Sequence, residues 1–335
     1  FTNTTINNTG GSGSGADGAG ISVRSSYFAA EFNGLEVSNA TGPGVFALNG
    51  GAIQGNDWNL HHNGQEGFYL ESAATIVDGL QLSNNGDSGV HIDDARFVFL
   101  SNLSSSNNGD AGLEFNRAND IESGSGDVRC TSCSSVNDTR GVSITDSVDL
   151  YLHGLQIHDP VNGPAISIDN SGLDIGVQGG LFHLQNVESW INHSGPAIDI
   201  SGAEGVIDGL DMYGSHTGLV WDADHNVERE SVLSNANLSG TGCLNLSNHD
   251  QLSGSGNIIT TGCTGTLDFE NVELNWTKLE DKSSHVLNVD TDSHLHLHQP
   301  INVGYSIANI DGNGWIEEAW DLNIWVVNNY SNGVP

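Results

Sequence analysis

Short runs of alternating apolar and polar residues recur along most of this 335-residue chain, and each run follows a turn rich in Asn, Gly, Asp and Ser. The segment 83–90, Ser-Asn-Asn-Gly-Asp-Ser-Gly-Val, returns almost letter for letter at 106–113. Runs such as Val90-His91-Ile92 have the period of two that is typical of strands with one buried face. The alternation therefore predicts many short strands separated by turns, with helix-favouring runs nearly absent.

A small residue followed by an apolar residue opens most of the repeats, mostly at intervals of 20 to 24 residues. The openings are Gly20, Gly44, Gly67, Gly89, Gly112, Gly141, Ala165, Ala197, Gly218, Gly242 and Gly262. Self-similarity of this period indicates a solenoid, and the Leu-x-x-Leu-x-Leu lattice of leucine-rich repeats is missing. Three short strands per turn predict an all-β fold: a right-handed parallel β-helix of about eleven coils over residues 20–278, with coils ~4.8 Å apart.

The two flanks of the repeat region have different patterns. Residues 1–19 are polar and fit an N-terminal cap, a linker or a donated strand. Beyond residue 278 the alternation runs over longer stretches, and Asp311-Gly312-Asn313-Gly314 is a hairpin turn signal. We therefore expect a short antiparallel β segment, part of a β-sandwich module, over residues 279–335. The final residues, 322–335, resemble the first strand and turn of bacterial and archaeal immunoglobulin-like surface domains.

The charge balance is strongly acidic, because Lys and Arg total 8 against 42 Asp and Glu, which gives a net charge of −34. Such a surface repels nucleic acid and anionic lipid, so neither is predicted as a partner. It suits salty water, where screening shortens to ~3 Å at 1 M salt, and we expect a marine or halophilic source. No apolar run is long enough to span a bilayer. The terminal Phe1 and Pro335 are expected to be cut points within a longer protein.

Four cysteines predict two disulfides. Cys243 and Cys263 occupy the same place in successive Thr-Gly-Cys repeats, so stacking of the coils should bring their Cα atoms within ~4.4–6.8 Å. Cys130 and Cys133 could close a local bridge within one loop. A zinc site is the less favoured alternative, because it needs two close pairs and only one pair is close. Disulfides indicate an oxidising compartment, and we expect an extracellular or cell-surface location.

Asn-x-Ser/Thr sequons agree with that location, although a chain rich in Asn, Ser and Thr also forms them by chance. If the source is archaeal or eukaryotic, we expect some of them to be glycosylated. They are Asn3, Asn7, Asn39, Asn102, Asn137, Asn192, Asn237, Asn245, Asn275 and Asn329.

Three histidines in one predicted strand are a candidate metal site. His294, His296 and His298 would share one face and could present nitrogen ligands to Zn²⁺ or Cu²⁺. Successive residues on one face are nearly 7 Å apart, however, so a solvent-facing polar strand is the favoured alternative.

A calcium loop is a second candidate metal site. Asp311 and Asn313, within Asn309-x-Asp311-x-Asn313-Gly314, resemble the front half of an EF-hand or dockerin loop, but the twelfth position is Trp320 in place of an acid. A plain hairpin is the favoured alternative. No cofactor is required by the sequence, and acidic pairs at the coil corners could bind Ca²⁺.

The repeat pattern resembles the pectate-lyase and polygalacturonase superfamily, with its carbohydrate-binding and sugar-hydrolase repeats, over roughly residues 20–275. Of the polygalacturonase motifs only Asp93-Asp94 occurs, and residues 220–225, Val-Trp-Asp-Ala-Asp-His, resemble a pectate-lyase motif with one residue added. The resemblance implies an active site at Asp222, Asp224 and His225. The Arg-x-Pro-x-x-Arg lyase motif is missing, which puts catalysis in doubt.

Three hypotheses for function follow. The first is an extracellular structural or adhesive surface protein: a rigid, acidic, glycosylated rod that contacts like subunits or other surface proteins. The second is a polysaccharide-active enzyme, a Ca²⁺-dependent lyase or a glycoside hydrolase on acidic glycans. The third is a non-catalytic module that binds glycans or metals. Arginine or lysine beside clustered carboxylates would favour the enzyme.

Overall fold

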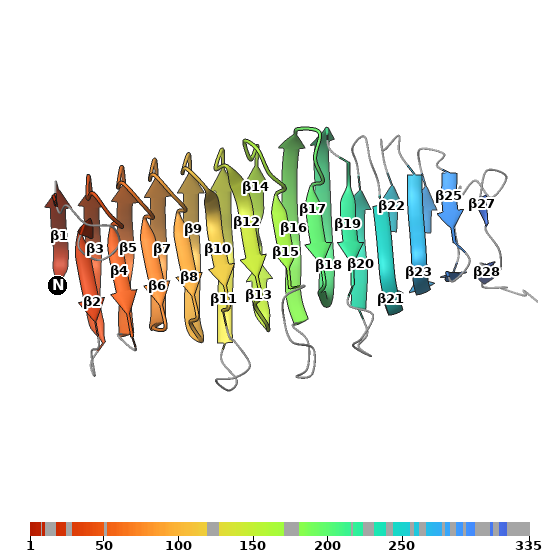
Figure 1. Cartoon of the computed structure of the whole chain (residues 1–335), viewed down its shortest axis with the longest axis horizontal. Helices are drawn as coiled ribbons and strands as arrows, with labels where there is room; N and C mark the ends of the chain where they lie inside the picture. Colours follow the sequence, from red (N-terminus) through yellow and green to blue (C-terminus); the bar gives the residue numbers. More distant parts are fainter. Residues whose placement is uncertain are drawn as a thin grey trace, which may run out of the picture.

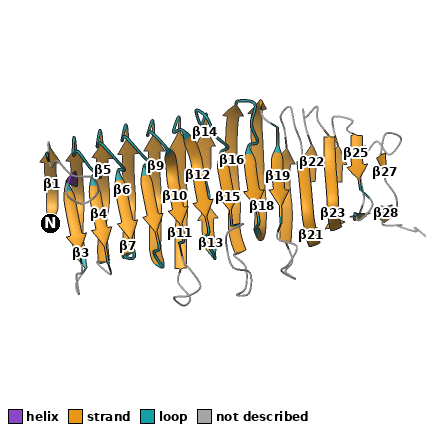
Figure 2. Cartoon of the chain, viewed as in Figure 1, coloured by secondary structure: helices purple, strands orange, loops and turns teal. Residues whose placement is uncertain are grey.

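The computed structural model describes residues 1–7, 9–10, 18–24, 29–49, 52–118, 127–170, 181–215, 217–223, 231–238, 244–254, 258–260, 266–276, 279–281, 286–290, 293–298, 309–310 and 315–319. Within these residues the chain forms strands and turns with no α-helix, and every strand pairing is parallel (Figures 1 and 2). The predicted parallel β-helix is confirmed. No described helix is long and apolar enough to cross a bilayer.

One series of short strands stacks along the whole rod and is called the short-strand ladder. Its members are β2 (Ile21–Arg24), β4 (Val45–Leu48), β6 (Phe68–Glu71), β8 (Val90–Asp93), β10 (Ala111–Asn116), β12 (Arg140–Thr145), β15 (Ile166–Asp169), β17 (Ile198–Ser201), β19 (Leu219–Asp222), the first parts of β21 (Leu244–Gly254) and β23 (Thr266–Trp276), β25 (Val286–Val289) and β27 (Asn309–Ile310).

The remaining strands form the long-strand ladder on the other two faces of the coil. They are β1 (Thr2–Asn7), β3 (Ala30–Ser38), β5 (Ala52–His61), β7 (Ala74–Ser83), β9 (Phe97–Ser106), β11 (Asp127–Val136), β13 (Leu150–His153), β14 (Gln156–His158), β16 (Leu181–Asn192), β18 (Glu204–Ser215), β20 (Ser231–Leu238), the later parts of β21 and β23, β22 (Ile258–Thr260), β24 (Leu279–Asp281), β26 (His294–His298) and β28 (Trp315–Ala319).

Several strands of the long-strand ladder are bent near their middle by one residue in the left-handed backbone region. Gly34, Asp57, Gly79 and Asn102 have φ values of 65°, 56°, 71° and 51°. The pairing register stacks these residues on one another. Gly, Asn and Asp adopt this conformation more readily than other residues, so the polar letters of the repeat set the corner between two faces of the coil.

A single apolar core runs along the inside of the rod. Inward residues stack on their copies in neighbouring coils, for example Val45 on Phe68 and Phe68 on Val90. The largest buried side chains include Trp58 and Trp221, whose indole N–H groups donate 2.8 Å hydrogen bonds to backbone carbonyl oxygens. Because each coil exposes its apolar edge to the next, stability depends on repetition.

Four polar residues also stack inside one corner, and they are called the amide ladder. Asn63 donates to Asn85 at 3.0 Å, Asn85 donates to Asn108 at 2.9 Å, and Asn108 donates to Asp138 at 2.9 Å, in each case from the side-chain amide. All four residues are buried. Their oxygens also accept backbone N–H groups of the preceding coil, so each side chain links two coils.

Two expectations need correction. The antiparallel pairing expected over residues 279–335 is wrong for the described strands, since β25 to β28 continue the ladders in parallel. The period of two is common to both strand directions, and Leu295 and Leu297 join the same core. The hairpin residues 311–314 and the segment 320–335 lie outside the described part of the chain.

The coil count also differs slightly from eleven. The openings from Gly20 to Gly218 precede or lie at the start of short-ladder strands, whereas Gly242 and Gly262 lie outside the described residues. The same ladder then continues through β25 and β27, where the glycine signature is missing. At the other end, β1 within residues 1–19 pairs with β3 as a further strand of the coil.

Replacement of Asn85 by Ala should lower the free energy of unfolding by about 2–4 kcal/mol, because it removes one link of the amide ladder and leaves buried N–H groups of neighbouring coils unpaired. Urea denaturation followed by circular dichroism measures the change. Gln81→Ala, at an exposed position of the adjacent strand, is the matched control and should stay within about 0.5 kcal/mol of wild type. Equal effects of the two substitutions would contradict a stabilising amide ladder.

Candidate functional site

A group of ionisable side chains gathers on the outer surface of the short-strand ladder and the turns that precede it. The register that buries Phe68, Val90 and Leu113 stacks the next residue of each strand on the outside, so that Tyr69 lies beside His91 and His91 beside Glu114. The group is called the Glu114 cluster and comprises Glu66, Asp87, His91, Asp110, Glu114 and Arg140.

Glu114 is the centre of the cluster. Its Oε2 accepts a 2.6 Å hydrogen bond from the Ser88 hydroxyl and lies 3.1 Å from Nδ1 of His91. Burial alone would raise the pKa of Glu114, but the hydrogen bonds from His91 and Ser88 outweigh it and lower the pKa to about 2. Burial opposes protonation of His91, yet its hydrogen bond to Glu114 and the surrounding carboxylates raise the pKa of the imidazole. Glu114 is therefore ionised and paired.

Two neighbouring carboxyl groups are shifted in the opposite direction. Burial raises the pKa of Glu66, and the charges of Asp87 and Glu114 raise it further. The pKa of Asp87 is raised by burial and by Asp110 and Glu114. The cluster thus places two carboxyl groups of raised pKa beside one of lowered pKa. This arrangement occurs in acid–base sites and also in structural ion networks.

Arg140 closes the cluster on the side of β12. Its Nε and Nη2 atoms donate to the two carboxylate oxygens of Asp110 at 2.8 and 2.6 Å, and its Nη1 donates to Ser143 at 3.2 Å. This bidentate geometry fixes the guanidinium group. About a third of each of the Arg140 and Asp110 side chains is exposed, so the pair is reachable from solvent.

The cluster can exchange protons and form hydrogen bonds, but it is not arranged for nucleophilic catalysis by serine. A serine nucleophile needs its hydroxyl bonded to the histidine base, whereas Ser88 donates to Glu114, the same oxygen that His91 faces. Among the described residues no three His, Cys, Asp or Glu side chains come together to hold a metal ion.

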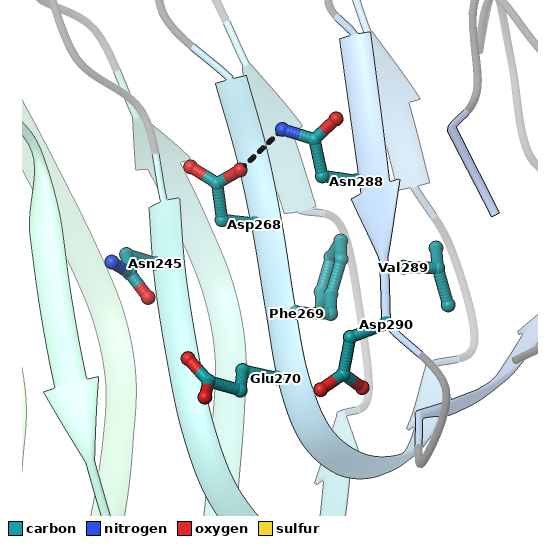
Figure 3. A pocket seen from close by; sticks show the side chains of 7 residues that line it. All are labelled: Asn245, Asp268, Phe269, Glu270, Asn288, Val289 and Asp290. Atoms are coloured by element: carbon teal, nitrogen blue, oxygen red, sulfur yellow. Dashed lines mark hydrogen bonds between the residues drawn. The ribbon is translucent and has the colours of Figure 1, made fainter. Parts of the chain in front are cut away.

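A second site is an acidic cleft of about 500 Å³ near the carboxyl end of the described rod (Figure 3). Its lining residues come from β21, β23 and β25: Asn245, Asp268, Phe269, Glu270, Asn288, Val289 and Asp290. The Asn288 amide donates a 2.6 Å hydrogen bond to Asp268 of the neighbouring coil. The carboxylates lie in two outward columns, as Figure 3 shows, and the cleft is strongly negative.

The catalytic residues that the sequence resemblance implied are not brought together in the described part of the chain. Asp222 ends β19, and its Oδ1 accepts hydrogen bonds from Ser247 at 2.9 Å and Asn248 at 2.7 Å. It therefore ties two coils together. Asp224 and His225 lie outside the described residues.

One of the two predicted cysteine pairs can be seen. Cys130 and Cys133 are joined by a disulfide with Cα atoms 6.1 Å apart. Both side chains are buried within β11, where they flank the left-handed corner residue Ser132, so the bridge lies in the core of the coil and not in a loop. Cys243 and Cys263 lie outside the described residues.

The sequons lie on the outside of the rod wherever their side chains are described. Asn237 is half-buried, while the others are exposed: Asn3, Asn7, Asn39, Asn102, Asn137, Asn192 and Asn245. The side chain of Asn275 and all of Asn329 fall outside the described part.

The candidate metal residues are partly described. His294 and His296 both lie on the outward side of β26, as the alternation predicted, and Nδ1 of His296 is 3.1 Å from Oε2 of Glu317 in the next coil. The side chain of His298, and both Asp311 and Asn313, lie outside the described residues. The imidazole of His296 is thus engaged with a carboxylate.

The Glu114 cluster was not identified from the sequence, although a signal for it exists. His91 and Glu114 each follow the apolar residue of a glycine opening, Gly89-Val90-His91 and Gly112-Leu113-Glu114. Alignment of the two repeats places the two side chains in one outward column. The alignment does not predict that Glu66 and Arg140 also lie close to this column, because their positions depend on how the turns before the strands fold.

Comparison with known proteins gives a match for part of the chain. A family model described as "Right handed beta helix region" matches residues 19–182, which extend from just before β2 to the start of β16. No curated protein and no solved structure matches the chain. The matched region contains the whole Glu114 cluster.

Replacement of Glu114 by Gln should lower the pKa of the His91 imidazole, because it removes the charge that favours the protonated ring. NMR titration of the imidazole resonances measures the pKa, and Gln81→Ala should leave it unchanged.

The ion pair of Glu114 and His91 contributes stability that is lost as pH falls towards the pKa of Glu114, about 2, or rises through the raised pKa of His91. An unchanged His91 titration in Glu114→Gln would refute the pairing.

Proposed function

We propose, from the premise that residues 19–182 are a right-handed β-helix region and that the same parallel coil continues to β28, that this protein is a structural or adhesive module of an extracellular surface. The observation that carries the proposal is the single core and unbroken pairing from β1 to β28 (Figure 1). Such a coil is a stiff rod with one pair of ends, which suits a spacer or a filament element.

The covalent and charge chemistry of the rod supports an extracellular location. The Cys130–Cys133 disulfide is the kind of bond that persists in oxidising compartments. A net charge of −34 keeps such rods apart and soluble at low salt, and concentrated salt screens the repulsion within and between them. The exposed sequons are accessible acceptors for glycans. Like subunits or other surface proteins are the partners that a rod of this kind would contact.

A second candidate function, action on a polysaccharide, is favoured by the Glu114 cluster. Glu66 has a raised pKa and Glu114 a lowered one, so Glu66 would serve as general acid and Glu114, which stays ionised, as charge stabiliser. The cluster holds four carboxyl groups against one guanidinium group. A neutral glycan therefore suits it better than the uronic-acid polymers that the family resemblance implied.

The surface proposal predicts that the protein is exposed on intact cells of its source. Antibody labelling and mild protease treatment of intact cells should reach it, while a cytosolic marker protein stays protected. Protection of both proteins until the cells are lysed would refute the extracellular location, whatever the fold.

The two candidate functions differ in an activity assay. Under the structural proposal, incubation with neutral polysaccharides, and with pectate and alginate with and without Ca²⁺, should release no reducing ends and form no unsaturated products. Turnover that falls by about 10²-fold or more in both Glu66→Gln and Glu114→Gln, but persists in Gln81→Ala, would replace the structural proposal by the enzymatic one.

A further inference from the structure

One outward column of the long-strand ladder departs from the polar character of its neighbours. The register pairs Ile76 with Phe99, Phe99 with Arg129, Arg129 with Tyr151, and Tyr151 with His183. The column crosses β7, β9, β11, β13 and β16, a length of ~19 Å at the spacing of paired strands. Together with Phe97, at the amino end of β9, these residues are called the apolar strip.

The strip is exposed to an unusual degree. Ile76 is 58%, Phe97 51% and Tyr151 38% exposed. Single exposed apolar residues are ordinary on protein surfaces, but a contiguous row of bulky ones marks an interaction site. Next to Phe97 the surface opens into a cavity of about 290 Å³, which is lined by small side chains and by Asp94 and Arg96. A cavity beside an exposed aromatic ring can receive an apolar side chain from a partner.

Charges of both signs lie around the strip, although the chain as a whole is strongly acidic. Arg96 and Arg129 are two of only 8 basic residues in a protein of net charge −34. The Arg129 guanidinium carbon lies 5.1 Å from the centre of the Tyr151 ring, which holds this cation within the strip. Asp94 at the cavity, Asp127, which pairs with Phe97 in the register, and Asp149, whose charge acts on His183, supply the opposite sign. The two arginines therefore reduce, at the strip, the repulsion between two copies of this acidic chain.

We propose that the apolar strip is a docking surface for a second copy of this chain, with the two rods side by side and related by a twofold axis. Twofold docking places the same patch on both partners, so the patch must complement itself. The strip does so, because the arginines of one copy can face Asp94 and Asp149 of the other while the apolar side chains meet between them. Its composition of Phe, Tyr, Ile and Arg matches the core of protein interfaces, where Lys and Glu are depleted. The proposal does not depend on the function proposed above.

The test is sedimentation velocity of the purified chain over a range of protein and salt concentrations. We expect a monomer–dimer equilibrium in which the dimer gains from about 0.02 M to about 1 M NaCl, because salt screens the repulsion between two chains of net charge −34. The double substitution Ile76→Ser/Phe97→Ser should weaken dimerisation by at least ~10-fold. Val161→Ser, at an apolar residue that is 57% exposed elsewhere on the rod, is the matched control and should dimerise like wild type. Circular dichroism confirms that each variant is folded.

A third variant tests the charge complementarity. Arg129→Glu should weaken the dimer as well, since it places like charges across the interface. A monomer at every protein and salt concentration would overturn the proposal, and so would a dimer that survives both strip variants. If the wild type stays monomeric but binds glycans on an array in a manner lost with Ile76→Ser/Phe97→Ser, the strip is a glycan site and the proposed occupant is wrong.

Discussion

The structure depends on one constraint: equivalent residues of successive coils must lie in register, each backbone N–H bonded to a carbonyl of the neighbouring coil. Within the described strands, which extend from Thr2 in β1 to Ala319 in β28, the register shifts at one place, between His249 and Leu252. A slip by one residue would turn every inward side chain outward. The polar corner residues prevent this, since a left-handed residue and the amide ladder can match only their own copies.

The same constraint explains why polar chemistry gathers in columns on this protein. A residue type that recurs at one repeat position comes to lie ~4.8 Å from its copy. Apolar copies gain from this contact, but like charges do not, and the chain has few bases with which to alternate. The negative charge of a carboxylate in a column is instead compensated by hydrogen bonds from amides, hydroxyls or a histidine. Asn288 compensates Asp268 in this way, and His91 and Ser88 compensate Glu114. At Glu66, burial raises the pKa, and the neighbouring charges of Asp87 and Glu114 raise it further.

The sequence was sufficient to predict the parallel coil but not to predict the Glu114 cluster. The period of the glycine openings, the alternation within each run and the Asn, Gly and Asp corners are local signals, and from Gly20 to Gly218 the openings correspond to described strands. The sequence could not predict the direction of the last strands, since alternation is the same in parallel and antiparallel pairing. The glycine openings that mark the parallel coils also do not recur there. The motif-based candidate Asp222 proved to be a link between coils. The Glu114 cluster is assembled from short-ladder strands of different coils and the turns that precede them, and no single motif spans them.

The outward columns also differ in how far their large apolar side chains cover one another. Trp190 and Tyr213 stack with ring centroids 4.6 Å apart, and Phe46, Tyr69 and His91 form a similar row, so these aromatic groups cover one another along the axis. Stacking of this kind turns ring edges towards solvent and supports the coil. Within the apolar strip Tyr151 also stacks on His183, with ring centroids 4.4 Å apart, whereas Ile76 and Phe97 remain more than half exposed beside a cavity. These two residues at the other end of the strip therefore form the part of the surface that is best suited to meet a partner along the side of the rod.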